Sequence, residues 1–261
     1  MSGIRSIRDI WHRKGHVLNG YITLGGAASA ELYCHQGWDS VTLDMEHGAI
    51  GFDAAVDLLR AMAASGVVPL ARVPKGDPTW VSTLLDAGMM GITAAMIETP
   101  EEAQRLVQAC RYPPEGTRGM SRQCRAALLH GPDYTAQANS LVSVFAMVET
   151  HTALAQLEAI AAVPGLDGLY FGGVDYEMSL RSLSPEQAAK TPTVQAARHA
   201  IVQACQRHGI LAGMNANSPA AAGELIAQGF RFITLSSDAQ ALSTQARAWV
   251  NQTRALFDQP R

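Results

Sequence analysis

The chain of 261 residues has few charged and few aromatic residues. Charged residues make up 16% of the sequence and the formal net charge is −3, so no basic surface is indicated for nucleic acid or for an anionic membrane. No apolar run approaches the roughly 20 residues that span a bilayer. We therefore expect neither a nucleic-acid partner nor a membrane partner.

Cysteine is also scarce. The four residues Cys34, Cys110, Cys124 and Cys205 are scattered and form no CxxC pair. Isolated thiols of this kind are typical of a reducing compartment rather than of a disulfide framework. The first residues mix charged with apolar side chains and contain no secretory apolar region. We predict a cytoplasmic protein.

Several signatures of covalent catalysis are missing as well. The sequence contains no GxSxG or SxxK motif that would indicate a serine nucleophile. Lysine occurs only at Lys14, Lys75 and Lys190, and none of the three ends a strand-like run. A Schiff-base mechanism needs a desolvated lysine, so the sequence argues against that chemistry.

The sequence does contain a regular alternation of strand-like and helix-like segments. Short apolar runs typical of buried parallel strands lie at 20–24, 40–44, 67–72, 91–96, 143–149, 168–172, 209–214 and 232–236. Helical patterns lie between them, including 52–65, 150–162 and 191–208. Eight such repeats predict a single (β/α)8 TIM-barrel domain over residues 1–261. A doubly wound open sheet is the alternative, which is weakened because no GxGxxG follows the first run.

Ionisable residues occur where several of these strands are predicted to end. Asp44 and His47 lie at the end of the second run, and Arg72 ends the third. Glu149 ends the fifth run, and Asp175 follows the sixth. The carboxyl ends of barrel strands share one face, which is where active sites lie in this architecture. The pattern therefore predicts an enzyme's active site rather than a binding module.

Glu149 and Asp175 would lie on neighbouring strands. Two adjacent carboxylates repel each other unless a proton or a cation lies between them. Oxygen ligands with room for water suit Mg²⁺ or Mn²⁺, so we predict one divalent metal site. The alternative is that each carboxylate caps the following helix. His151 is a further candidate ligand, although a histidine at a helix start is more often a surface residue.

His47 follows Asp44 by three residues. A contact between these side chains would orient the imidazole for proton transfer, and we predict that His47 is the general base. Glu46 is a competing base, but alternation along an extended chain would turn it away from His47. Arg72 can donate a bidentate fork to a carboxylate or stabilise an oxyanion, and the alternative is a structural ion pair.

An ordered series of motifs covers most of the chain between about residues 20 and 240. The segments are 43–48 (Leu-Asp-Met-Glu-His-Gly), 71–74, 84–88, 99–103, 111–119, 148–150 and 166–175. In order and spacing this series resembles the HpcH/HpaI family of metal-dependent (class II) pyruvate aldolases. Members of that kind include 4-hydroxy-2-oxoheptanedioate and 2-dehydro-3-deoxygalactarate aldolases.

The resemblance implies a role for each residue at the predicted site. Glu149 and Asp175 would bind the divalent metal. Arg72 would stabilise the enolate of the bound 2-oxo acid, and His47 paired with Asp44 would transfer protons. The pyruvate carboxylate would be held by the backbone of a single turn, formed by Gly172, Gly173, Val174 and Asp175.

The resemblance also implies an assembly of trimers paired into hexamers. Asp86 would reach into the site of a neighbouring subunit, and a C-terminal helix near residues 240–257 would be exchanged between subunits. That segment has an apolar stripe that one barrel leaves uncovered. The stripe consists of Ala241, Leu242, Ala246, Trp249, Val250 and Leu256.

Three positions depart from the pattern of many family members. Gly173 stands where many have proline, Met147 where many have glutamine, and Tyr176 where many have leucine. We expect Met147 to remove a polar neighbour from the ligand shell and Tyr176 to place a bulky polar group near the metal. These differences bear on the choice of aldehyde more than on the core chemistry.

Together, the residues and the resemblance predict a carbon–carbon lyase. The enzyme would cleave 4-hydroxy-2-oxo acids reversibly to pyruvate and an aldehyde, with Mg²⁺, Mn²⁺ or Co²⁺, in the catabolism of aromatic compounds or sugar acids. Oxaloacetate decarboxylation and macrophomate-synthase-like chemistry use the same enolate and are alternatives, and a role on CoA esters is a more distant one. A 2-oxo acid sensor is the alternative that is not an enzyme.

Overall fold

The computed structural model describes residues 6–76 and 78–257 and forms a closed barrel of eight parallel strands. Each strand pairs with the next in chain order, and the last pairs with the first. The strands are β1 (Val17–Ile22), β2 (Ser40–Asp44), β3 (Val68–Val73), β4 (Gly91–Ala94), β5 (Ser143–Val148), β6 (Gly168–Phe171), β7 (Leu211–Ala216) and β8 (Phe232–Ser237). The (β/α)8 prediction is confirmed and the open-sheet alternative is wrong.

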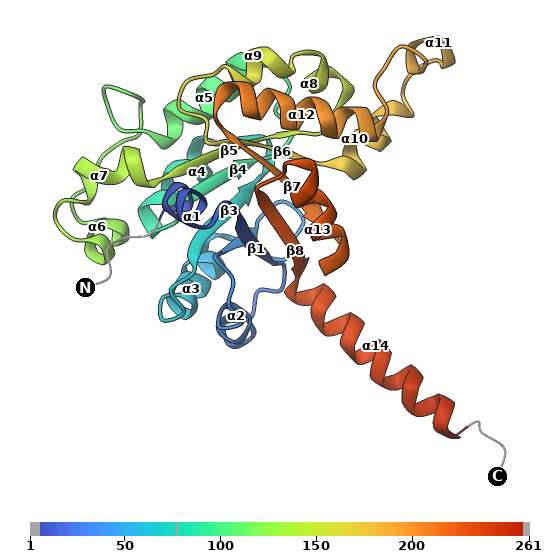
Figure 1. Ribbon diagram of the computed structural model, residues 1–261. Coiled ribbons are helices and arrows are strands. Elements are labelled where there is room, and N and C mark those ends of the chain that lie inside the picture. The colour runs from blue at the N-terminus through green and yellow to red at the C-terminus, as the bar shows by residue number, and fades with distance from the viewer. Residues whose placement is uncertain (1–5, 77, 258–261) are drawn as a thin grey trace.

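Helices surround the barrel (Figure 1). They are α1 (Ile7–Lys14), α2 (Ala27–Cys34), α3 (Phe52–Met62), α4 (Pro78–Ala87), α5 (Pro100–Cys110), α6 (Arg125–His130), α7 (Tyr134–Leu141), α8 (His151–Ala155), α9 (Leu157–Ala161), α10 (Gly173–Leu180), α11 (Pro185–Ala188), α12 (Val194–His208), α13 (Pro219–Gln228) and α14 (Asp238–Phe257), with a short 3₁₀ turn η1 (Pro74–Gly76). In the part of the chain that is described, no helix combines the length and apolarity needed to cross a membrane.

Two predicted boundaries shift for identifiable reasons. β1 begins three residues earlier than expected because Asn19, a polar residue that interrupts the apolar run, is fully buried inside the barrel. Its side chain donates to Thr234 Oγ1 at 3.0 Å and accepts from Ser40 Oγ at 2.8 Å. The helix predicted at 150–162 is interrupted at Gln156, so that α8 and α9 replace it.

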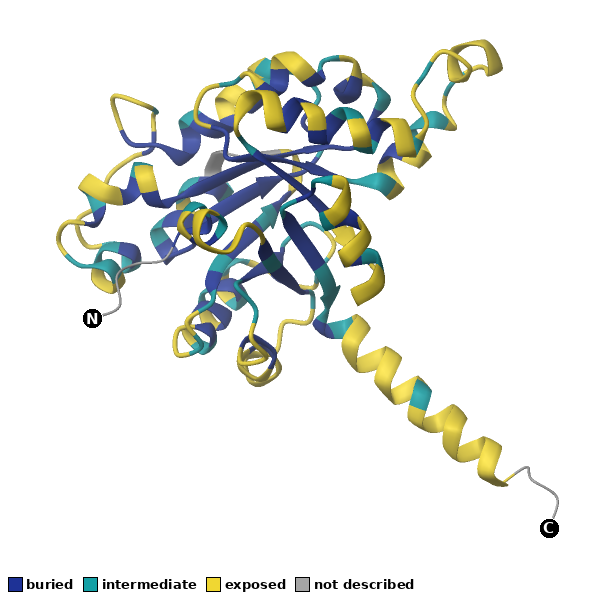
Figure 2. Ribbon diagram, in the orientation of Figure 1, coloured by how far each residue is buried: buried dark blue, intermediate teal, exposed yellow. Residues whose placement is uncertain are grey.

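The core has an inner and an outer layer. Inside the barrel, the rings of Phe145 and Phe232 stack with their centroids 4.8 Å apart. A larger apolar layer lies between the strands and the helices. Figure 2 shows the strands buried almost throughout, with the exposed residues on the outer helix faces and on α14. Burial on both faces explains why the strand sequences are apolar and do not alternate.

The long connection between α5 and β5 carries α6 and α7 and is anchored by two buried arginines. Arg111 donates to the carbonyl of Val142 at 2.9 Å, and Arg118 Nη2 donates to Asp86 Oδ1 at 2.7 Å. Because α5 ends and β5 begins at the amino ends of the strands, this connection lies at the end of the barrel opposite the mouth, which is formed by the carboxyl ends of the strands. Asp86, in the last turn of α4, lies at that same end.

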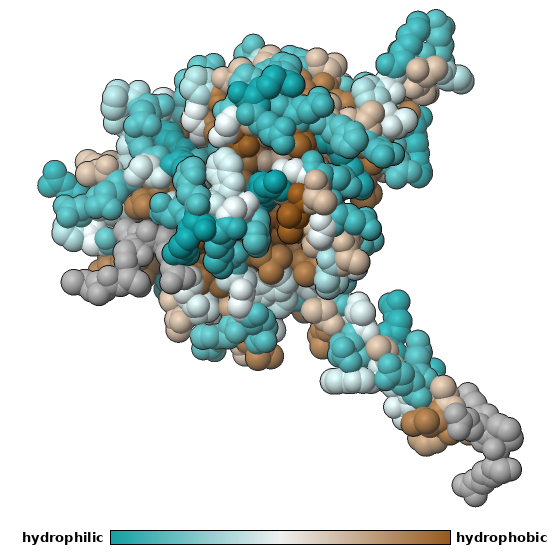
Figure 3. Space-filling model, viewed as in Figure 1, coloured by the Kyte–Doolittle hydropathy of each residue, from teal (hydrophilic) through white to brown (hydrophobic). Residues whose placement is uncertain are grey.

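Helix α14 leaves the body of the protein after a tightly bonded first residue. The carboxylate of Asp238 accepts hydrogen bonds from the backbone and hydroxyl of Thr23 and from the backbone of Leu24. Beyond that point the helix extends away from the barrel (Figure 1), and apolar side chains appear near its far end (Figure 3). Leu242 and Trp249 are each 64% exposed and Leu256 is 68% exposed.

We expect the apolar face of α14 to be covered by another copy of the chain, because a continuous exposed apolar stripe is typical of an association surface. Light scattering at micromolar concentration should give a multiple of the chain mass. Trp249→Ser with Leu256→Ser should reduce that mass. The matched polar-face variant, Thr244→Ser with Asn251→Ser, should keep it. A monomeric mass for the unchanged chain would contradict the expectation.

Candidate active site

The carboxyl ends of β2, β3, β5 and β6 bring the predicted residues to one end of the barrel. Asp44, the last residue of β2, stands in register with Arg72 of β3. Glu149 directly follows β5, and Asp175 lies in the first turn of α10 after β6. These four residues were predicted to meet, and they do. Asp86 is not among them within one chain, so its role remains a prediction that needs a second subunit.

Asp44 and Arg72 form a two-pronged ion pair. Arg72 Nε donates to Asp44 Oδ1 at 2.9 Å, and Nη2 donates to Oδ2 at 2.6 Å. The guanidinium also lies 5.0 Å from the centre of the Tyr21 ring. Burial alone would raise the pKa of Asp44, but the hydrogen bonds and charge of Arg72 hold that pKa below its usual value. Asp44 is therefore ionised, and its carboxylate fixes the position of the Arg72 guanidinium.

The predicted pairing of the Asp44 and His47 side chains is wrong. Asp44 Oδ1 instead accepts the backbone N–H groups of Glu46 and His47, at 3.2 and 3.1 Å. The imidazole of His47 is 63% exposed, and its Nε2 lies 3.7 Å from Glu46 Oε2. The chain turns after Asp44, so strand alternation no longer applies. Glu46 and His47 therefore meet on one side, which the sequence reasoning had excluded.

Glu46 also approaches Arg72, with Oε2 lying 3.5 Å from Arg72 Nε. One carboxylate oxygen thus lies between the guanidinium and the imidazole. Burial raises the pKa of Glu46, while the charges of Arg72 and His47 act to lower it. Sequence reasoning named Glu46 only as a competing base. The glycine that follows Glu46 and His47 indicates a turn, and a turn at this point would have predicted that the two side chains lie side by side.

Glu149 is a buried carboxylate in an acidic setting. It is 2% exposed, and its Oε1 accepts the backbone N–H of Met96 at 2.7 Å. Burial raises the pKa of Glu149 to about 7, and the charges of Asp175 and Glu46 act in the same direction. Gly172 lies directly over this carboxylate, because a Cβ there would come within 2.1 Å of Glu149 Oε2. A side chain at position 172 is therefore excluded.

A divalent cation fits the donor set of Glu149 and Asp175. A cation would relieve the unfavourable charge on the buried carboxylate, and Mg²⁺ is often held by only one or two carboxylates plus water and substrate. Among the residues that are described, no cluster of three or more His, Cys, Asp or Glu side chains forms a metal site. His151 is thus not a third member, and water and substrate would complete the coordination.

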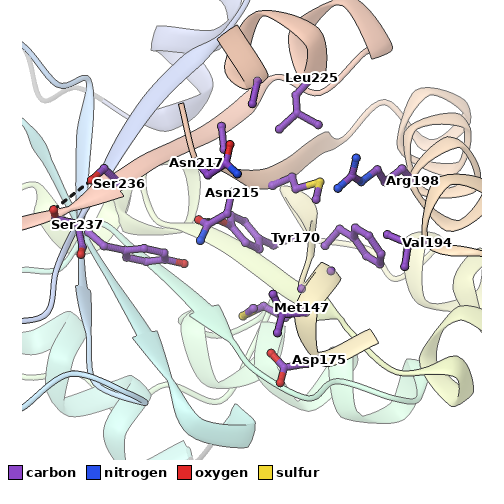
Figure 4. A pocket seen from close by; sticks show the side chains of 18 of the residues that line it. Met147, Tyr170, Asp175, Val194, Arg198, Asn215, Asn217, Leu225, Ser236 and Ser237 are labelled. Atoms are coloured by element: carbon purple, nitrogen blue, oxygen red, sulfur yellow. Dashed lines mark hydrogen bonds between the residues drawn. The ribbon is translucent and has the colours of Figure 1, made fainter. Parts of the chain in front are cut away.

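A cavity of about 660 Å³ opens beside these residues. Arg72, Met147, Gly173 and Asp175 are among the residues that line it, and Figure 4 labels Met147 and Asp175 in its wall. The predicted carboxylate-binding turn, Gly172–Asp175, forms the start of α10. The amide N–H of Gly172 donates to the carbonyl of Val148. The amide N–H groups of Gly173, Val174 and Asp175 lie in the first turn of α10. N–H groups in the first turn of a helix have no carbonyl partner within the helix.

Tyr176 does not approach the predicted metal ligands, and that expectation is wrong. Its side chain is fully buried, and its hydroxyl donates to the carbonyl of Pro192 at 2.7 Å. The polar group added to the wall of the cavity comes from Tyr170 and Asn215 instead. The hydroxyl of Tyr170 donates to Asn215 Oδ1 at 2.6 Å.

A parallel barrel with acids, a base and a guanidinium at its mouth defines an enzyme of the TIM-barrel class. The model of the HpcH/HpaI aldolase/citrate lyase family matches residues 20–244, and the chain belongs to this family.

Characterised relatives are similar over nearly the whole chain. A hydroxypyruvate/pyruvate aldolase of Rhizorhabdus wittichii is 34% identical over 256 residues, which cover 97% of this chain and 100% of the relative. A 2-dehydro-3,6-dideoxy-6-sulfogluconate aldolase of Pseudomonas putida is 33% identical, with 90% of this chain and 91% of the relative covered.

Solved structures share the fold. An HpcH/HpaI aldolase/citrate lyase family protein from Burkholderia cenocepacia superposes with a TM-score of 0.83 at 32% identity, covering 92% of this chain and 95% of that one. Macrophomate synthase superposes with a TM-score of 0.84 at 28% identity, covering 95% and 88%.

The raised pKa of Glu149 predicts a pH-dependent cost to folding in the metal-free protein. Burial raises its pKa from an ordinary value of 4.5 to about 7 in the folded protein, so the destabilisation grows as pH rises from about 5 to about 7 and then levels off. In chelator, Glu149→Gln should therefore be more stable than the unchanged protein at pH 8, by on the order of 1–3 kcal/mol, and nearly equal at pH 5.

Denaturant unfolding at the two pH values measures this difference. Glu31→Gln, an exposed carboxylate on α2, is the control and should show no such trend. Added Mg²⁺ should raise the stability of the unchanged protein and not that of Glu149→Gln. A Glu149→Gln advantage that is independent of pH would contradict the assignment.

Proposed function

We propose that the protein is a class II aldolase, a divalent-metal-dependent lyase that cleaves 4-hydroxy-2-oxo acids reversibly to pyruvate and an aldehyde. The observation that carries the proposal is the meeting of Arg72 and Asp175 in one cavity beside the buried carboxylate of Glu149. A fixed cation and two acids able to hold a metal suit the stabilisation of an enolate. The aldolase names of the relatives support the same reaction.

The residues divide the work of binding the 2-oxo acid. A divalent cation held by Glu149 and Asp175 would polarise the 2-oxo group and share the negative charge that develops as the C–C bond breaks. Arg72 keeps N–H groups beyond the two given to Asp44, and it lines the cavity, so it can donate to the same oxygen. The free amides of Gly173, Val174 and Asp175 suit the carboxylate, as helix N-termini do.

Cleavage also requires a base that removes the proton of the C4 hydroxyl group. His47 is exposed at the mouth and would accept this proton directly or through a water molecule. Glu46, 3.7 Å from the imidazole, would stabilise its protonated form, a task that the sequence had given to Asp44. Asp44 acts on His47 only through the backbone.

Hydroxypyruvate is a second candidate for the nucleophilic partner. The Tyr170–Asn215 pair places a hydroxyl and an amide in the wall of the cavity. A hydroxyl group on the carbon that attacks the aldehyde would find hydrogen-bond partners there, whereas a methyl group would not. The name of the relative from Rhizorhabdus wittichii, hydroxypyruvate/pyruvate aldolase, includes both hydroxypyruvate and pyruvate.

The proposal extends to the assembly and to the compartment. A hexamer with exchanged α14 helices would cover the exposed apolar stripe and bring Asp86 of one subunit to the site of another. The four cysteines are free, which supports a cytoplasmic location. Mg²⁺, Mn²⁺ and Co²⁺ all accept carboxylate ligands, and each suits this site.

A coupled assay for pyruvate release tests the function. A panel of 4-hydroxy-2-oxo acids of varied length is supplied with Mg²⁺, Mn²⁺ or Co²⁺, and with excess chelator. We expect pyruvate release with metal and its loss in chelator. Full activity in chelator would refute the role of the metal. Binding of pyruvate without cleavage of any substrate would favour a 2-oxo acid sensor.

The role of His47 predicts a split between two reactions. Oxaloacetate decarboxylation yields the same enolate but needs no base at a hydroxyl group. His47→Ala should therefore lose about 10²–10⁴-fold in aldol cleavage and far less in decarboxylation, with both activities still dependent on metal. His151→Ala, which changes a histidine at the start of α8, is the matched control. Equal proportional losses would show that His47 acts in binding or structure.

A further inference from the structure

The cavity continues beyond the catalytic residues into a groove between α12 and α13. Val194 and Arg198 lie one turn apart on α12 and line this part. Leu225 and Gln228 line it from α13. A volume of about 660 Å³ is within the range of pockets that hold ligands much larger than pyruvate. The groove therefore offers room for the aldehyde portion of the substrate.

Arg198 is the basic residue of this groove, and it lacks a partner within the described part of the chain. Its Nε is buried without a hydrogen-bond partner, and no described carboxylate lies within ion-pair distance of the guanidinium. The fully buried arginines each bond an acid, as Arg111 does with Asp167 and Arg118 with Asp86, whereas the partly buried Arg198 does not. Because unpaired polar groups are costly to bury, this arginine is poised for an external acceptor.

Figure 4 shows how Arg198 enters the cavity. The side chain points inward from α12 on the side opposite Ser236 and Ser237, with Asn215 between them and Asp175 below. Gly173 borders the route from the mouth to the groove. A Cβ at that position would lie 3.3 Å from Met214 Cε and 3.4 Å from Phe171 Cε1, so a side chain there would have to press against these two residues of the cavity wall.

Two acids also line the cavity, Glu177 on α10 and Glu224 on α13. Both are exposed to solvent, so their charges are hydrated and screened. Neither pairs with Arg198. Arg198 is partly buried and has no acidic partner among the described residues, so its guanidinium, rather than the hydrated carboxylates, sets the chemistry of a ligand that reaches the groove.

We infer that Arg198 binds a carboxylate at the far end of the substrate and thereby selects 4-hydroxy-2-oxo acids that carry a second, terminal carboxylate. The inference rests on the proposed function, because Arg72, Asp175 and the first turn of α10 must hold the 2-oxo acid end for the aldehyde portion to extend toward the groove. A planar guanidinium suits a carboxylate through its two-pronged geometry. Arg198 is thus a specificity-determining residue and not part of the bond-breaking step.

The test compares a matched pair of substrates of equal length, one ending in a carboxylate and one in the neutral amide. Steady-state kcat/KM is measured for pyruvate release by the unchanged enzyme, Arg198→Met, Arg198→Lys and Arg207→Met. Arg207 is on the same helix at its exposed end and serves as the control for loss of one positive charge.

In Arg198→Met, the carboxylate-to-amide ratio of kcat/KM should fall about 10- to 100-fold, the effect of losing a charged hydrogen-bonding partner. Most of the change should be in KM. Arg198→Lys should recover part of the ratio, and Arg207→Met should keep that of the unchanged enzyme. Equal losses for both substrates, or an unchanged ratio, would overturn the role of Arg198.

Failure of the proposed function would look different. Metal-dependent exchange of the methyl protons of pyruvate in D₂O, followed by NMR in the unchanged enzyme, reports on the 2-oxo acid end alone. Absence of both exchange and cleavage would refute the aldolase and the substrate assignment of Arg198 together. Exchange and cleavage with an unchanged ratio in Arg198→Met would refute Arg198 alone.

Discussion

Closure of eight parallel strands into one barrel is the constraint on which the site depends. Closure places Asp44 beside Arg72 in strand register, and it brings Glu149 and Asp175 to the same end although they come from separate repeats. The stacked Phe145 and Phe232 rings fill the interior beneath them. Because the interior is packed, the four polar side chains have only the mouth to occupy, and their mutual distances are set by the sheet rather than by flexible loops.

Negative charge exceeds positive charge among the ionisable side chains at the mouth, and the excess lies where a metal ion would bind. Arg72 is paired with Asp44 and approached by Glu46, so one fixed cation serves two acids while part of its guanidinium still faces the cavity. Within the described part of the chain, Glu149 receives one backbone hydrogen bond, from Met96, and burial raises its pKa to about 7. The deficit of positive charge therefore lies at Glu149 and Asp175. A divalent cation there would complete the balance, while the Asp44–Arg72 pair stays fixed as substrate arrives.

The sequence predicted what strand topology determines and missed what turns and side-chain direction determine. The ends of apolar runs located Asp44, Arg72, Glu149 and Asp175 because every parallel strand delivers its last residue to one face. Glu46 was turned the wrong way because the chain leaves the strand after Asp44 and alternation no longer holds. Tyr176 was misplaced since a helical residue can point toward a neighbouring helix as readily as toward the mouth. The start of β1 was predicted too late because Asn19 is polar, and a buried polar residue interrupts the apolar pattern from which strands are predicted.

Reaction and selectivity thus arise from different parts of the barrel. The groups that we propose to act in bond breaking come from strand ends and the first residues after them, where position is rigid. The groove that holds Arg198 is built from one face of α12 and one face of α13, outside the strands. A substitution on a helix face alters that groove without disturbing the Asp44–Arg72 pair or the acids around Glu149. On the proposed function, the same enolate chemistry could be combined with different terminal groups on the aldehyde, since the groups proposed to recognise the aldehyde are not those proposed to hold the 2-oxo acid.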